Sequence, residues 1–210
     1  VDVLAIGALF TSAACVLFPQ AQRGMYIKRL MPTFFGLVFV SFLLQYFIRI
    51  LQVGGSESDD LFMGFGLFFS LWVVVVAKFS DIGALLVGKA IGRTKLAPSI
   101  SPGKTIEGLI GGFGASAGMG ALLPWIFQEK FPDVVYFGDW VFTPVQGALW
   151  GFVIALSAVI GDLIASVMKR LASMKDSGGA IPGIGGLFDL TDSLILAAPT
   201  GYLILFLLQK

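Results

Sequence analysis

The feature that most constrains this chain is a series of long apolar stretches, each close to the length that crosses a lipid bilayer. A bilayer core of about 30 Å needs about 20 apolar residues in a helix. Of the 210 residues, 57% are hydrophobic and only 13% are charged, whereas a soluble domain has about 25% charged residues. We therefore predict an all-α fold, a polytopic transmembrane helix bundle that forms one integral-membrane domain. The six expected spans are Val3–Phe18, Leu30–Leu51, Leu61–Ala77, Ile106–Phe127, Val145–Ala165 and Ser193–Leu208.

Two further expectations concern the end of the third span and the start of the chain. No strong helix breaker follows Ala77, so the third helix is expected to continue through Asp81 to Gly88. The chain begins with Val1, and an apolar run follows at once without the basic leader or the cleavage site of a signal peptide. We therefore expect further N-terminal helices ahead of the first span.

The distribution of Lys and Arg predicts how the spans are oriented. Of the 14 basic residues, only Arg49, Lys130 and Lys210 lie outside the segments that follow the first, third and fifth spans. Because Lys and Arg are enriched in cytoplasmic loops, these three segments are expected to face the cytoplasm. The formal net charge of +1 indicates no general attraction to nucleic acid.

The residue types that are absent limit the possible chemistry. The chain has no histidine, and its single cysteine, Cys15, lies in an apolar run. This excludes histidine-based triads, most zinc sites and an internal disulfide. Acid–base or metal chemistry must therefore use carboxylates, lysines or hydroxyls.

Small residues recur every four positions on the fourth expected span, at Gly108, Gly112, Ser116 and Gly120. This spacing allows two helix backbones to approach closely in lipid. We favour tight packing inside the bundle. The alternatives are a homodimer interface or the close approach of a ligand to the backbone.

A first polar cluster extends from Asp81 to Gly108 and includes Ser101-Pro102-Gly103-Lys104-Thr105 directly before an expected helix. Hydroxyls, a lysine and free backbone N–H groups ahead of a helix N-terminus can bind an anion. A P-loop is excluded, because Pro98 stands where that motif needs its first Gly, and no strand is expected ahead of the helix.

The second polar cluster begins on the fifth span. Asp162, Ser166, Lys169 and Arg170 have the spacing of one helix face. Asp162, like Asp81, is expected at the cytoplasmic end of its span, where a carboxylate is costly. Either these carboxylates are functional, or each is simply paired with a nearby lysine.

The second cluster continues with a segment rich in glycine, 178–186, which is too flexible for a helix and suits a close approach to phosphates. Asp189 and Asp192 follow and share a face at the start of the sixth span, although either could instead be the N-cap of that helix. Carboxylates without His or Cys suit Mg²⁺. Mg²⁺ beside Lys and Arg is typical of sites for a nucleoside triphosphate or pyrophosphate.

The two clusters together resemble the signature of the phosphatidate cytidylyltransferases, also called CDP-diacylglycerol synthases. The second cluster follows that family's pattern S-x-x-K-R-x4-K-D-x-G-x3-P-G-H-G-G-x-x-D-R-x-D, with Ile184 in place of His and Leu190 in place of Arg. The first cluster, with LAPSISPGKTIEG, is also similar. The resemblance covers about Asp81 to Tyr202, which places the catalytic part at about 78–208. The two replacements bear on the preferred lipid more than on the class of reaction.

The resemblance implies a cytidylyltransferase of phospholipid biosynthesis, in a membrane such as the bacterial inner membrane. It would convert CTP and phosphatidic acid to CDP-diacylglycerol and pyrophosphate with Mg²⁺, at a site facing the cytoplasm. The expected catalytic residues are Asp162, Lys169, Arg170, Lys175, Asp176 and Asp189. The expected substrate-binding residues are Asp81, Ser101, Lys104, Thr105, Glu107, Ser166, Gly183, Gly185 and Gly186. The expected Mg²⁺ ligands are Asp162 and Asp189, with Asp192 assisting.

Two other functions remain open. A CTP-dependent transferase or kinase that acts on a polyprenol or another lipid alcohol would use similar phosphate-binding residues, but would need a base for the hydroxyl. An ion-coupled transporter could also contain carboxylates within the membrane. Such transporters commonly have repeated halves, whereas this sequence shows no internal repeat and its polar residues gather at one face.

Overall fold

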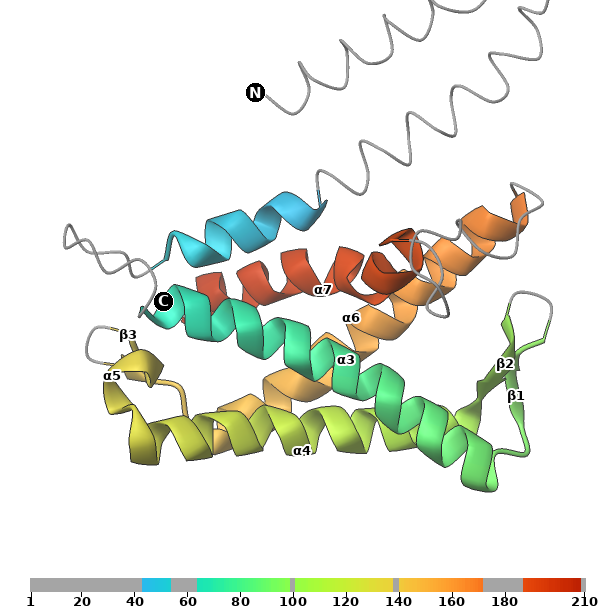
Figure 1. Cartoon of the computed structure of the whole chain (residues 1–210), viewed down its shortest axis with the longest axis horizontal. Coiled ribbons are helices and arrows are strands. Elements are labelled where there is room, and N and C mark those ends of the chain that lie inside the picture. Colours follow the sequence, from blue (N-terminus) through green and yellow to red (C-terminus); the bar gives the residue numbers. More distant parts are fainter. Residues whose placement is uncertain (1–42, 54–63, 99–100, 138–139, 172–186, 209–210) are drawn as a thin grey trace, which may run out of the picture.

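The computed structural model describes residues 43–53, 64–98, 101–137, 140–171 and 187–208. Within these ranges the fold is mostly helical, and four long helices pack together (Figure 1). They are α3 (Phe65–Ile91), α4 (Ile106–Lys130), α6 (Pro144–Leu171) and α7 (Leu187–Leu208). Each contains a segment that is long and apolar enough to cross a membrane.

The last four expected spans are confirmed, with different ends. The third helix continues past Ala77 to Ile91, as expected from the lack of a breaker, and Gly92 caps it by donating its N–H to the Gly88 carbonyl. Of the first two expected spans, Val3–Phe18 lies outside the described residues. The second is described only from residue 43, and residues 43–51 are helical.

Two short antiparallel hairpins interrupt the helical fold. Strands β1 (Lys95–Ala97) and β2 (Ser101–Thr105) connect α3 to α4. Strands β3 (Tyr136–Phe137) and β4 (Trp140–Val141) follow the short helix α5 (Pro132–Val135) at the other end of α4 (Figure 1). The expectation that no strand precedes α4 was therefore wrong. Pro98 and Pro102 disfavour a helix here, and pairing of Lys95 with Thr105 returns the chain to the start of α4.

The hydrophobic core is densest at the end of the bundle where α3 begins. Phe69 stacks on Trp72 with 5.2 Å between ring centroids, and Phe142 contacts the edge of Trp72 at 5.1 Å. The Trp72 indole N–H donates a hydrogen bond to the Gly120 carbonyl, which fastens α3 to α4. Asp81 lies 16 residues after Phe65 on α3, or about 24 Å along the helix. The polar end of the bundle is thus well separated from this aromatic cluster.

The small residues of α4 pack inside the bundle, which confirms the favoured interpretation of their spacing. Gly108, Gly112, Ser116 and Gly120 are all buried. The Ser116 hydroxyl lies 3.1 Å from the Val76 carbonyl of α3 and 3.0 Å from the Gly151 carbonyl of α6. Because both neighbours of this stripe belong to the same chain, the stripe is an intramolecular helix contact. A homodimer stays a prediction.

Candidate active site

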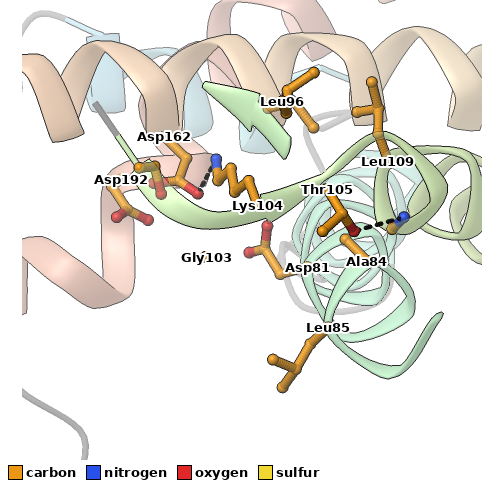
Figure 2. A pocket seen from close by; sticks show the side chains of 13 residues that line it. Asp81, Ala84, Leu85, Leu96, Gly103, Lys104, Thr105, Leu109, Asp162 and Asp192 are labelled. Atoms are coloured by element: carbon orange, nitrogen blue, oxygen red, sulfur yellow. Dashed lines mark hydrogen bonds and ion pairs between the residues drawn. The ribbon is translucent and has the colours of Figure 1, made fainter. Parts of the chain in front are cut away.

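A cavity of about 400 Å³ lies at the polar end of the bundle, where β2 meets α3, α4, α6 and α7 (Figure 2). It brings the two polar clusters of the sequence together. Its apolar lining includes Leu85, Leu96, Leu109 and Val159. The polar residues that line it are Asp81, Ser101, Lys104, Thr105, Asp162 and Asp192. All six were expected from the sequence to bind substrate or metal.

An ion pair crosses the cavity between the two clusters. Lys104 extends from β2, and its ammonium group lies 2.5 Å from the carboxylate of Asp162 on α6 (Figure 2). The two side chains are 25% and 23% exposed, so they are partly shielded from solvent. Ser166, one turn along α6, donates a hydrogen bond to the same carboxylate at 3.4 Å. Asp162 is thus paired with a lysine, and it also faces the cavity.

Asp192 places a second carboxylate beside Asp162. It lies near enough for the two negative charges to repel each other, and Lys169 of α6 is 3.6 Å from it. Its carboxylate also accepts a hydrogen bond from the backbone N–H of Ser193. Because α7 begins at Leu187, neither Asp192 nor Asp189 is the N-cap of this helix, and that alternative was wrong.

Asp81 places a third carboxylate in the cavity, from α3. Lys78, one turn earlier on the same helix, lies 3.6 Å from it. The Lys78 ammonium donates a hydrogen bond to the Ser193 hydroxyl of α7 at 2.8 Å. This network fastens α3 to α7 beside the cavity. Lys78 and Ser193 were not expected at the site, although the spacing of Lys78 and Asp81 by one helical turn was visible in the sequence.

The hairpin that presents Lys104 is anchored at both sides. Thr105 is buried and caps α4, because its hydroxyl accepts the N–H of Gly108 at 3.1 Å. Glu107 was expected to bind substrate, but it does not line the cavity. Its carboxylate instead accepts the backbone N–H groups of Arg93 and Thr94, both at 3.1 Å. Glu107 therefore holds the segment that leads into β1.

Replacing Glu107 by Ala is expected to loosen the hairpin without unfolding the bundle. The change leaves two backbone N–H groups without their acceptor, and because both hydrogen bonds are exposed to solvent, the loss of stability should be small. Amide hydrogen exchange at residues 93–105 should accelerate by about ten-fold, while exchange in the aromatic core stays unchanged. Glu107→Gln, which retains one acceptor oxygen, should show a smaller effect. Equal exchange in all three proteins would contradict this role.

The remaining expected site residues lie at the margin of the cavity or beyond the described residues. Lys169 reaches the cavity through Asp192, and Arg170 is exposed at the end of α6. Asp189 lies in the first turn of α7, but its side chain is outside the described part. Lys175, Asp176, Gly183, Gly185 and Gly186 also lie outside the described residues.

The cytidylyltransferase family matches this chain over residues 2–208. The chain belongs to that family. Among its relatives, the phosphatidate cytidylyltransferase of a Synechocystis species is 41% identical over 143 residues, which is 68% of this chain and 45% of the relative. The phosphatidate cytidylyltransferase of Chlamydia trachomatis is 34% identical over 176 residues, covering 84% of this chain and 54% of the relative.

Two further relatives are a named enzyme and an uncharacterized protein. The phosphatidate cytidylyltransferase of Bacillus subtilis is 32% identical over 81% of this chain and 56% of the relative. An uncharacterized protein of Escherichia coli is 34% identical over 79% of this chain and 50% of the relative. The chain spans about half the length of the curated relatives that it matches. The family is therefore established, whereas the lipid substrate is a matter for a proposal.

The donor atoms around the cavity are of the chemical type that Mg²⁺ prefers. Asp81, Asp162 and Asp192 contribute carboxylate oxygens from three different helices, and Mg²⁺ prefers such hard ligands. In the part of the chain that the structure describes, no three acidic side chains are grouped closely enough to form a complete metal site. Lys104 and Lys169 instead neutralise two of the carboxylates.

Proposed function

We propose that this protein transfers the cytidylyl group of CTP to phosphatidic acid, giving CDP-diacylglycerol and pyrophosphate. The observation that supports it most is the convergence of three carboxylates and Lys104 on one cavity at the polar end of a membrane bundle. Several relatives with this family's sequence are named phosphatidate cytidylyltransferases. The distribution of basic residues supports a cytoplasmic position for the cavity, as in the bacterial inner membrane.

In this reaction a phosphate oxygen of phosphatidic acid attacks the α-phosphorus of CTP. A new P–O bond forms, the bond from the α-phosphorus to the bridging oxygen breaks, and pyrophosphate leaves with that electron pair. The second pKa of a phosphomonoester is about 6, so the attacking oxygen is already ionised at neutral pH. No protein base is required, which agrees with a chain that has no histidine.

The main obstacle is the repulsion between two anions, and the residues of the cavity address it. Lys104 can hold a phosphate when it leaves Asp162, and Lys169 can do the same beside Asp192. Asp162 and Asp192 would hold Mg²⁺, together with Asp189 if its side chain follows the family pattern. When bound, Mg²⁺ neutralises phosphate charge and orients the leaving group. The Ser101 hydroxyl, which also lines the cavity, can donate a hydrogen bond to the nucleotide.

The apolar lining of the cavity suits a lipid substrate. Leu85 and Leu109 belong to α3 and α4, and Leu85 is 54% exposed on the outer surface of the bundle. A lipid can therefore keep its acyl chains in the bilayer beside Leu85 while its phosphate enters the cavity. A soluble acceptor would not require this apolar lining.

Labelled CTP tests this proposal against the kinase alternative. The protein in detergent, given phosphatidic acid and CTP labelled at the α-phosphate, should produce labelled lipid, and EDTA should abolish the incorporation. CTP labelled at the γ-phosphate should label only pyrophosphate. Label from the γ-phosphate in lipid would instead indicate a kinase, and incorporation with a polyprenol but not with phosphatidic acid would overturn the assignment of the acceptor.

A further inference from the structure

Helical residues 43–51 lie beside α7 (Figure 1), and residues of both line a second cavity away from the candidate active site. Its volume is about 330 Å³, and we call it the Arg49 cavity. It shares no described residue with the catalytic cavity. Its lining consists of Tyr46, Arg49, Pro199, Tyr202, Leu203 and Phe206. The sequence placed Arg49 on the side of the membrane opposite the other basic clusters, and the function proposed above does not use it.

The guanidinium of Arg49 lies beside two aromatic rings that also contact each other. Its central carbon lies 5.3 Å from the ring centre of Tyr46 and 5.9 Å from that of Tyr202, and the two rings lie 5.3 Å apart. Contacts of this kind use the flat faces of a guanidinium. A guanidinium that contacts aromatic rings still has N–H donors, and such donors form the paired hydrogen bonds by which arginine recognises a phosphate.

The charge of Arg49 is not matched by a protein carboxylate within the described residues, where no ion pair involves it. An ionisable side chain beside lipid is costly unless it finds a partner. Leu203 and Phe206, which line the cavity, are 55% and 49% exposed, so they can contact lipid acyl chains. A cation in an apolar, lipid-facing cavity is complementary to an anion that has its own hydrocarbon.

The position along α7 gives the depth of this cavity. Tyr202 lies six residues before the end of α7 at Leu208, which is about 9 Å along the helix. Arg49 reaches the cavity from near the end of its own helix, which stops at residue 51. Tyrosines and the long side chain of arginine commonly anchor proteins near lipid headgroups. The Arg49 cavity is thus placed to meet lipids of the leaflet opposite the active site.

We propose that the Arg49 cavity binds the phosphate of an anionic phospholipid of that leaflet. Arg49 binds the phosphate, the two tyrosines fix the plane of the guanidinium, and Leu203 and Phe206 contact the acyl chains. An anionic lipid is favoured over a zwitterionic one, because no described residue that lines the cavity is a carboxylate that could bind an ammonium headgroup.

Native mass spectrometry of the delipidated protein in dodecyl maltoside tests this site. Titration with dioleoyl phosphatidylglycerol should show one preferred lipid, retained more strongly than dioleoyl phosphatidylethanolamine. Arg49→Gln should weaken that binding by about ten-fold, because it removes a charge-assisted contact. Lys130→Gln, which removes another exposed cation from the same end of the bundle, is the matched control and should bind as the wild type does. Free glycerol phosphate at the same concentration should not compete.

Three results would overturn the proposal: equal binding of the two lipids by the wild type, unchanged phosphatidylglycerol binding in Arg49→Gln, or competition by free glycerol phosphate. If Arg49→Gln does not fold, Arg49→Lys serves instead, and it should bind the lipid less tightly because an ammonium lacks the paired donors. In lipid-free detergent Arg49→Gln should keep the basal cytidylyl transfer of the wild type. Because the readout is lipid binding, its outcome is independent of whether the proposed reaction is found.

Discussion

Asp162→Asn is expected to reduce cytidylyl transfer by about a thousand-fold while the protein remains folded. The side chain lies at the centre of the polar network, because Lys104 pairs with it, Ser166 donates to it and Asp192 is close to it. Asn keeps the size of the side chain but removes its charge, so that the proposed Mg²⁺ site loses a ligand and Lys104 loses its counterion. Losing one preorganised electrostatic group in an active site commonly costs a hundred- to thousand-fold in rate. Initial rates with CTP and phosphatidic acid over a range of Mg²⁺ concentrations measure the effect.

Two controls make this result specific. Lys130→Ala changes a charged residue at the far end of α4 and should leave the rate nearly unchanged. The thermal midpoint of Asp162→Asn in detergent should stay within a few degrees of the wild type, because the carboxylate is partly exposed and its ion pair adds little stability. A rate within two-fold of the wild type at every Mg²⁺ concentration would remove Asp162 from the active site.

The helices and the chemistry of the cavity could be anticipated because their signals are local. The apolar runs identified α3, α4, α6 and α7, since hydrophobicity over about 20 residues depends on the bilayer and not on tertiary contacts. The spacing of Asp162 and Ser166 placed them on one face, and their hydrogen bond agrees with it. The stripe from Gly108 to Gly120 indicated close packing for the same reason.

The partners across the site could not be anticipated, because they depend on how the helices pack. Lys104 meets Asp162 from a different element, and Lys78 meets Ser193 although 115 positions separate them. The hairpin formed by β1 and β2 was missed because three- and five-residue strands show no period of alternation. Glu107 belongs to the family-like motif, but a motif does not tell whether a side chain contacts substrate or holds the backbone.

Asp192 shows how an error in one helix boundary changes an interpretation. The apolar run begins at Ser193, which made Asp192 a reasonable N-cap from the sequence. The helix begins at Leu187 instead, more than one turn earlier, so Asp192 lies within it and its carboxylate is directed into the cavity (Figure 2). Residues 187–192, Leu-Phe-Asp-Leu-Thr-Asp, extend the helix ahead of the apolar run, and this mixture of polar and apolar residues is not detected by hydropathy alone.

Gly120→Ala is expected to destabilise the bundle by about 2–3 kcal/mol, the range for overpacking a well-packed interior. A Cβ at this position would lie 2.3 Å from the Gly147 carbonyl oxygen and 3.3 Å from the Gly151 Cα. Because these neighbours are backbone atoms of α6, the clash is relieved only if α4 and α6 move apart. That movement would also strain the bond from Trp72 to the Gly120 carbonyl. The thermal midpoint in detergent should fall by several degrees.

Gly114→Ala on the same helix is the matched control. A Cβ there would meet no other described atom within 4 Å, and alanine favours a helix over glycine by about 1 kcal/mol. Its thermal midpoint should therefore stay level or rise, so that the same substitution has opposite signs six residues apart. Equal losses at both positions would mean that the effect of Gly120 comes from the helix itself and not from its contact with α6.

Gly147 of α6, which faces Gly120, tests whether the loss of stability comes from the contact between the two helices. A Cβ at Gly147 would lie closest to the Gly120 carbonyl oxygen, so Gly147→Ala should cost about as much as Gly120→Ala. Once one added methyl group has separated the two helices, the second finds its space partly open. The double variant should therefore lose less stability than the two single losses added together, by about 1 kcal/mol, as expected for coupled neighbours. Strict additivity would show that the two glycines do not share one contact, and that the approach of α4 to α6 does not limit the packing.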